Sequence, residues 1–200
     1  MLALAAPLYA SDSDFWNKKP PANWTPEEIG RLLKDSPWAQ EITPTYTSLP
    51  PPTDRQPWGE RPPFSGGSGP PLQKSLKAPY QATVRWESAD PVRIAQKTAL
   101  PATFGDYHVV GIYFDYATRR DLGSKPVENL QQSAVLMGSR PVNAEIVQVH
   151  PKIADGFLIG FPKTSTRGIK RFEFSCRIGL LALKAKFNTG EMLYHGQLAL

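Results

Sequence analysis

Proline is distributed so unevenly along this chain that its two parts require different kinds of structure. Fifteen of the 21 prolines lie in the first 80 residues, together with four of the five tryptophans. Proline removes a backbone donor and restricts the residue before it, so proline-dense segments avoid helix and sheet interiors. Residues 81–200 hold only six prolines and read as one strand after another. The sequence therefore predicts an extended N-terminal arm joined to a β-rich domain.

Length and charge narrow the class of protein. The roughly 120 residues after the arm suffice for a domain with its own core, and no run approaches the ~20 apolar residues of a membrane-spanning helix. The net charge is +5, and the whole excess lies in residues 81–200, with 15 basic and 10 acidic residues. We interpret this mild excess first as a solvated surface and second as a surface for an acidic partner. No nucleic-acid partner is predicted.

The first ten residues are small and apolar, and Ala10 is followed by the polar pair Ser11-Asp12. This is typical of the end of a secretory signal peptide, although the positively charged start of such a peptide is missing. We predict that residues 1–10 are a remnant signal peptide and that the protein is exported to the periplasm or cell envelope. A flexible terminus is the alternative.

Residues 11–41 form the tryptophan-rich arm and carry the clearest local signal in the chain. Thr25 and Glu28 form a Thr-x-x-Glu capping box around Pro26, a residue that suits the first turn of a helix. The pattern predicts a helix over residues 26–35. Because so short a helix is marginal alone, its apolar stripe needs a surface to cover.

The aromatic and apolar side chains of the arm are the candidate partner-binding residues. They dock either on the chain's own β-rich domain or on another protein, and the sequence does not choose between the two. These residues are Trp16, Trp24, Ile29, Leu32, Leu33, Trp38 and Trp58.

Residues 42–79 are rich in proline and glycine and are predicted to be a linker. Proline runs form semi-rigid polyproline II spacers, and Gly/Ser runs such as residues 65–69 are flexible. Recognition of the proline runs by an aromatic groove is the alternative interpretation.

Residues 80–200 are predicted to form an antiparallel β-sandwich or partly open barrel with about eight strands and one short helix. The helix is expected over residues 90–98, a loop over 116–129, and hairpin turns at 138–141 and 188–190. The expected strands cover residues 80–86, 107–114, 132–137, 142–149, 157–161, 169–178, 180–187 and 192–198.

The expected strand 169–178 alternates most regularly, with Phe172, Phe174 and Cys176 on one face. One face of such a strand lies in the core, so Cys176 is predicted to be an inert buried thiol. The opposite face combines with that of the next strand. We call the resulting candidate surface for an acidic partner the basic face: Lys170, Arg171, Arg177, Lys184 and Lys186.

No catalytic or metal-binding motif is recognisable. The chain has three histidines and one cysteine, none at zinc-ligand spacing, and no phosphate-binding glycine loop or Gly-x-Ser-x-Gly. We therefore predict no metal, no cofactor and no enzymatic activity. An enzyme with residues dispersed along the sequence is one alternative. A carrier of a small apolar ligand is another, with a cavity lined by Phe157, Phe161, Phe172 and Phe174.

Several stretches resemble a family of bacterial exported proteins of unknown function. They are residues 15–21 (FWNKKPP), 24–28 (WTPEE), 35–39 (DSPWA), 84–89 (VRWESA) and the closing stretch from Phe172 to Gly196. The resemblance implies export by a signal peptide and a bacterial envelope setting, and it brings no catalytic residues. The sequence thus favours a non-enzymatic exported protein that binds another envelope protein or forms a structural subunit of an envelope assembly.

Overall fold

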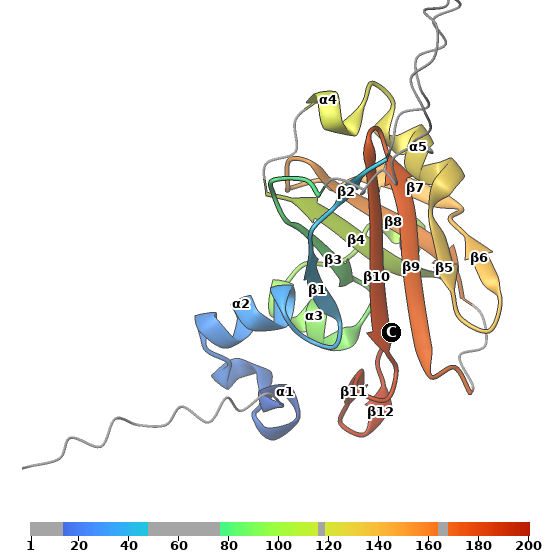
Figure 1. The fold of residues 1–200 in the computed structure, drawn as a ribbon. Helices are drawn as coiled ribbons and strands as arrows, with labels where there is room; N and C mark the ends of the chain where they lie inside the picture. The colour runs from blue at the N-terminus through green and yellow to red at the C-terminus, as the bar shows by residue number, and fades with distance from the viewer. Residues whose placement is uncertain (1–13, 48–76, 116–118, 164–167) are drawn as a thin grey trace, which may run out of the picture.

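Ten strands form two antiparallel sheets that pack face to face, which confirms the predicted mainly β fold of the sandwich type (Figure 1). The structure, a computed structural model, describes residues 14–47, 77–115, 119–163 and 168–200. The first sheet has the order β1-β3-β4-β8-β7 and the second β2-β10-β9-β5-β6. The strands are β1 (Ala39–Ile42), β2 (Thr45–Tyr46), β3 (Ala82–Trp86), β4 (Tyr107–Phe114), β5 (Val135–Met137), β6 (Pro141–Asn143), β7 (Ile146–Val149), β8 (Gly156–Pro162), β9 (Arg171–Ile178) and β10 (Leu181–Asn188).

The core lies between the two sheets, where alternate residues of each strand meet. Phe172, Phe174 and Cys176 on β9 point inward, as predicted, and Phe174 meets Phe161 of β8 edge to face at 6.1 Å. Trp86 of β3 lies among Phe172 and the neighbouring inward side chains and is fully buried. Large aromatic residues from both sheets therefore fill the interior.

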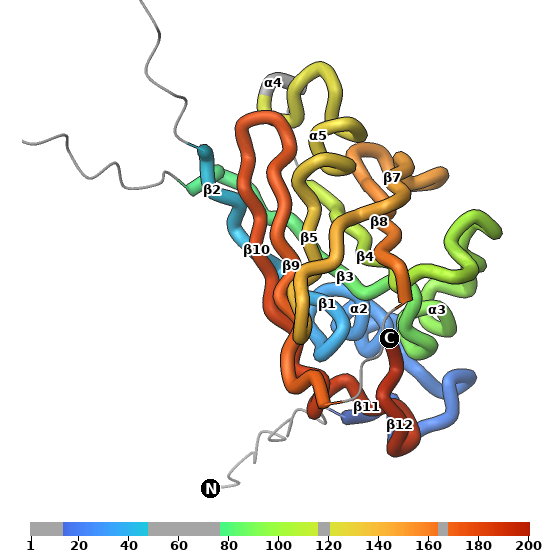
Figure 2. The backbone as a smooth tube through the Cα atoms, turned by 90° about the vertical axis from the view of Figure 1, so that its right-hand side faces the viewer, coloured from blue at the N-terminus to red at the C-terminus, as the bar shows by residue number. Residues whose placement is uncertain are grey.

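The chain itself bridges the two sheets at both edges. It passes from β1 to β2 through Thr43 and Pro44, and from β6 to β7 through Ala144 and Glu145. Because these strands are the edge strands, the crossings lie at opposite sides of the sandwich and give it the character of a partly open barrel (Figure 2). The predicted single strand over residues 142–149 is thus wrong, since it is interrupted where the chain changes sheets.

The described part of the arm belongs to the same fold as the β-rich domain. β1 lies at the end of the predicted arm and pairs with β3, and β2 lies in the predicted linker 42–79 and pairs with β10. The remnant signal peptide 1–10 and most of the linker lie outside the described residues.

The helices are more numerous than predicted. The capping box of Thr25 and Glu28 begins α2 (Pro26–Lys34), as expected. The expectation of one short helix after residue 80 is wrong, because α4 and α5 occupy the predicted loop 116–129. α5 buries only Leu130 fully and so lacks a visible apolar period. The helices are α1 (Phe15–Lys18), α2, α3 (Asp90–Gln96), α4 (Arg119–Leu122) and α5 (Pro126–Ser133).

The predicted final hairpin around residues 188–190 is also wrong. β10 pairs with β9 and β2, and the chain then turns away to form a small hairpin of β11 (Leu193–Tyr194) and β12 (Gln197–Leu198). Met192 is fully buried and Ala199 N donates to its carbonyl at 3.0 Å, which anchors the base of this hairpin. Figure 1 shows α1 and the hairpin at the same end of the molecule.

Within the described ranges, none of the helices has the length and apolar character that a membrane crossing requires.

Candidate functional site

The arm tryptophans lie in the chain's own core. The exposed fractions of Trp16, Trp24 and Trp38 are 5%, 7% and 0%. Phe15 meets Trp16 and Trp24 at ring-centroid distances of 5.1 and 5.6 Å, and Trp16 meets Trp38 at 5.3 Å, all edge to face. Such pairs stabilise a core by about 0.5–1.5 kcal/mol each beyond the burial of area.

Polar contacts fix the same cluster in place. Trp38 Nε1 donates to the Ala199 carbonyl at 2.8 Å, and Trp24 Nε1 donates to the Lys19 carbonyl at 3.2 Å. On α2, Leu32 is fully buried, and Ile29 and Leu33 pack partly buried against the core. The sequence allowed these side chains to dock either on the chain's own β-rich domain or on another protein. In the described part of the chain they dock on the chain itself. The seventh candidate, Trp58, lies outside the described residues.

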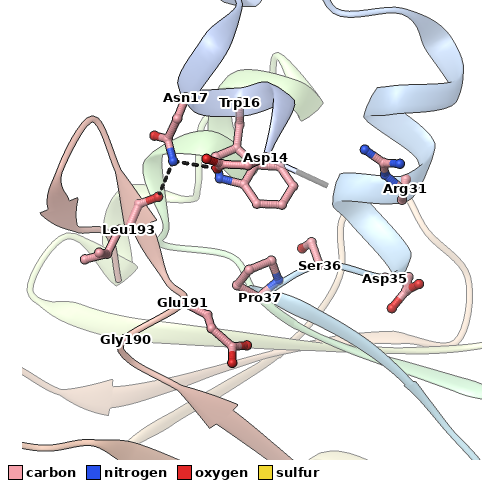
Figure 3. Close-up of a pocket in the computed structure, with 10 residues that line it drawn as sticks. All are labelled: Asp14, Trp16, Asn17, Arg31, Asp35, Ser36, Pro37, Gly190, Glu191 and Leu193. Carbon is pink, nitrogen blue, oxygen red and sulfur yellow. Dashed lines mark hydrogen bonds between the residues drawn. The ribbon is translucent and has the colours of Figure 1, made fainter. Parts of the chain in front are cut away.

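A cavity of about 550 Å³ lies between the arm and the C-terminal hairpin (Figure 3). Asn17 joins its two walls: Nδ2 donates to Asp14 Oδ1 at 2.7 Å and to the Leu193 carbonyl at 3.1 Å, and Oδ1 accepts from His195 N at 2.7 Å. The carboxylates of Asp14, Asp35 and Glu191 line the cavity together with Arg31. These three carboxylates are not grouped closely enough to hold a metal ion, and no other such group of His, Cys, Asp or Glu occurs among the described residues.

The structure brings the predicted basic face together on the outer side of the second sheet. Arg171 and Arg177 of β9 and Lys184 and Lys186 of β10 are all exposed, and every inward neighbour on these strands is buried. Ala182 pairs with Arg177, and Lys186 pairs with Glu173, so the cations lie on adjacent strands of one surface. Lys170, just before β9, is exposed as well.

One carboxylate lies among these cations. Glu173 Oε1 is 2.6 Å from Lys184 Nζ, and Glu173 Oε2 is 3.8 Å from Lys186 Nζ. The hydrogen bond from Lys184 and the nearby positive charges lower the pKa of Glu173. Arg171 and Arg177 form no ion pair with any described residue. The surface therefore keeps an excess of positive charge.

A cleft of about 570 Å³ opens on this surface, beside the edge of β10; we call it the edge cleft. It is lined by Thr43 and Thr45, by Ser133, by residues 175–177 of β9 and by residues 182–184 of β10. Ser133 Oγ donates to the Arg177 carbonyl at 2.7 Å and accepts from Arg177 N at 2.9 Å, which attaches Ser133 to β9. No carboxylate lines the edge cleft.

The four phenylalanines of the carrier hypothesis belong to the packed core. Phe157, Phe161, Phe172 and Phe174 have exposed fractions between 0% and 3% and lie in one hydrophobic cluster with the arm tryptophans. They fill the space between the sheets, which offers no support for an apolar ligand there.

A buried polar network that the sequence analysis missed lies on the outer side of the first sheet. Glu87 Oε1 accepts from Arg85 Nε and from Tyr113 Oη, both at 2.6 Å, and Oε2 accepts from Gln96 Nε2 at 2.7 Å. Arg85 also donates to the Leu33 carbonyl at 3.1 Å and lies over the Tyr113 ring at 4.5 Å. The sequence did contain a signal for this network, because polar and apolar residues alternate along residues 82–87 and place Arg85 and Glu87 on one face.

This network has the contacts of a structural element. Glu87 is 1% exposed, and each of its oxygens is satisfied by the chain itself. Burial raises the pKa of the Tyr113 hydroxyl, and the nearby Glu87 adds to this effect. Through Leu33 and Gln96 the network attaches α2 and α3 to the sheet. Three hydrogen bonds from the chain itself thus use most of the acceptor capacity of this buried carboxylate, as expected of a structural contact.

Cys176 and His108, whose side-chain types often act in catalysis, are both buried. Burial raises the pKa of the Cys176 thiol, which is 4% exposed, so the residue has the environment of an inert thiol. Burial, together with the charge of Lys163, lowers the pKa of His108 to about 4. Both ring nitrogens of His108 lack a hydrogen-bond partner among the described residues, and the ring meets Trp86 at 5.8 Å. His108 is therefore neutral at pH 7.

Comparison with known proteins returned no match: no family model, no curated protein and no solved structure is similar to this chain.

Proposed function

We propose that the protein is a non-enzymatic exported protein that binds an acidic partner in a bacterial envelope assembly, through the basic face of the second sheet. The observation that carries this proposal is the exposure of four cations on two adjacent strands, with a single carboxylate among them. A positive patch steers an acidic partner and fixes its orientation.

The arrangement of the arm supports the choice of this surface. Because Trp16, Trp24 and Trp38 are buried in the chain's own core, their contact area is already used within the protein. On the outer face of β9 and β10, in contrast, the four cations Arg171, Arg177, Lys184 and Lys186 are exposed. The setting in the envelope rests on the apolar N-terminus and on the resemblance described above.

A charge-reversal experiment in the native envelope tests the proposal. The double variant Arg177→Glu/Lys184→Glu changes the charge of the face by four units, and Lys125→Glu/Lys152→Glu makes the same change at exposed lysines elsewhere. Mild cross-linking, affinity capture and mass spectrometry would quantify the stoichiometric partner. We expect the first variant to lose at least about tenfold of the captured partner and the control to retain it, with a stronger effect at low salt.

Both variants must first show wild-type circular dichroism and melting temperature, since the four positions are exposed. Equal capture of the same partner by wild type and by the Arg177→Glu/Lys184→Glu variant would refute a role for the basic face. Cross-links confined to the chain itself would refute the assembly role altogether.

A further inference from the structure

The main chain of β10 has an open position at Lys184. Successive residues of an antiparallel strand direct their N–H and C=O groups to alternate neighbours. Ala182 pairs with Thr45 of β2, and the main chain of Lys186 pairs with the side chain of Gln40 of β1. Lys184 lies midway between these two residues, so its N–H and C=O point to the same side as theirs and away from β9.

Lys184 lies opposite Ser175 of β9, but no residue in the described part of the chain pairs with its main chain on the side away from β9. The pairing of β2 with β10 ends at Thr45 and Ala182, and no hydrogen bond joins the main chain of Lys184 to Thr43 or Pro44. The Pro44 carbonyl instead accepts from Ala78 N at 2.8 Å. A strand edge with a free donor and a free acceptor is a template for another backbone.

The edge cleft opens at this position and has the chemistry of an acceptor for acidic groups. Lys184 and Arg177 supply two cations, and Thr43, Thr45 and Ser175 supply hydroxyl groups. An incoming Asp or Glu therefore meets Arg177, which forms no ion pair with any described residue. Close to the open backbone it also competes with Glu173 for Lys184, whose Nζ lies 2.6 Å from Glu173 Oε1.

We infer that the edge cleft receives a short extended acidic segment of the partner, whose backbone pairs with Lys184 and whose carboxylate meets Arg177 and Lys184. The inference rests on the proposed function and specifies the partner's chemistry: an exposed, extended Asp- or Glu-containing peptide. In recognition by strand addition, main-chain hydrogen bonds supply affinity and the side-chain environment supplies selectivity. The closed positions at Ala182 and Lys186 limit the pairing to one or two residues, so an isolated peptide binds weakly.

Peptide titration of the full chain, labelled with nitrogen-15, tests the inference. Three probes of equal length are compared: acetyl-EVEVE-amide, the same peptide N-methylated at every residue, and acetyl-KVKVK-amide. The N-methylated peptide keeps the charges but has lost the N–H donor of each of its residues and cannot approach as a strand. We expect acetyl-EVEVE-amide to shift the Lys184 amide resonance, N-methylation to weaken binding at least about fivefold and the lysine peptide to cause no shift.

The possible failures are distinguishable. If both acidic peptides bind equally and shift only side-chain signals of Arg177 and Lys184, the backbone site is overturned while the charged surface stands. If neither acidic peptide perturbs Lys184 at millimolar concentration, the inference is overturned, even where capture of the partner from the envelope depends on the basic face. Arg177→Glu should weaken the acidic peptide about tenfold, and Lys152→Glu should not.

Discussion

The side-chain amide of Gln40 pairs with the main chain of Lys186 as another strand would. Gln40 Nε2 donates to the Lys186 carbonyl, and Gln40 Oε1 accepts from Lys186 N at 3.2 Å. Gln40 lies on the edge strand of the first sheet and Lys186 lies in the second, so this pair joins the two sheets beside the edge cleft.

Replacing Gln40 by leucine removes both hydrogen bonds and leaves the Lys186 amide open to water. We expect a loss of about 1 kcal/mol in unfolding free energy and exchange of the Lys186 amide hydrogen at least about fivefold faster. Native-state hydrogen exchange measures both. The control is Gln148→Leu, which removes one exposed side-chain contact to Thr103 at 3.3 Å. Unchanged exchange at Lys186 would contradict the pairing.

Trp38→Phe tests the attachment of the arm. The substitution leaves the Ala199 carbonyl without its donor and creates a void at a fully buried position. We expect a loss of about 2–4 kcal/mol, measured by urea denaturation. Trp24→Phe is the matched control, because its bond to the Lys19 carbonyl is longer and partly exposed, and it should cost clearly less. Equal losses for the two variants would argue against a special role for the Trp38–Ala199 contact.

The buried network around Glu87 predicts a large effect of a small change. Glu87→Gln leaves the Arg85 charge buried without its counter-ion and places an amide where donors converge, so we expect a loss of about 3–5 kcal/mol. The exposed pair Lys34–Glu41, 3.6 Å apart, is the comparison, and Glu41→Gln should cost less than about 1 kcal/mol. Thermal unfolding of both variants measures the contrast, and similar melting temperatures would be inconsistent with it.

Replacing Gly179 or Gly30 by alanine should change the stability of the fold in opposite directions. Gly179 has φ +54°, and a Cβ there would lie 2.2 Å from the Asp121 carbonyl oxygen. Gly179→Ala should therefore destabilise by more than about 2 kcal/mol. Gly30 lies in α2 with open space around its Cβ position, so Gly30→Ala should stabilise by about 0.5–1 kcal/mol. Chemical denaturation gives both signs, and a stable Gly179→Ala variant would contradict the close approach.

The burial of neutral His108 predicts that acid lowers the stability of the fold. Its pKa is about 4 in the fold, chiefly through burial, and about 6.5 in the unfolded chain. The unfolded state therefore binds a proton first as the pH falls, and the fold loses about 2.5 kcal/mol between pH 7.5 and 4.5 through this residue.

In His108→Leu this contribution is absent, whereas the carboxylates of both proteins titrate alike. The difference in unfolding free energy between wild type and variant, measured at both pH values, should therefore change by about 2.5 kcal/mol. Parallel pH profiles would show that His108 is not buried in its neutral form.

Local signals predicted the parts of the fold that depend on near neighbours. The capping box of Thr25 and Glu28 places α2, and the alternation of residues 171–178 places both Cys176 inside and Arg177 outside. α5 was missed because Leu130 alone is fully buried on it, so its apolar pattern has no visible period.

The pairing of strands that lie far apart in the sequence could not be predicted from the sequence. β1 and β2 are short and pair with strands 40 or more residues away, so nothing near them in the sequence marks them as parts of two sheets. The basic face was predictable from alternation on β9 and β10. The edge cleft was not, because it depends on where β2 stops and on the contact of Gln40 with Lys186, 146 residues away.

The contact between Trp38 and Ala199 has a consequence for how the chain is made. A ribosome synthesises Trp38 161 residues before Ala199, and the Trp38 indole N–H has its partner only once Ala199 is present. Met192 belongs to the same buried core as the aromatic cluster of the arm, so this core is incomplete until Met192 has left the exit tunnel. The packing of the arm therefore cannot be completed until Ala199 has been synthesised, and the nascent chain stays open at this contact until then.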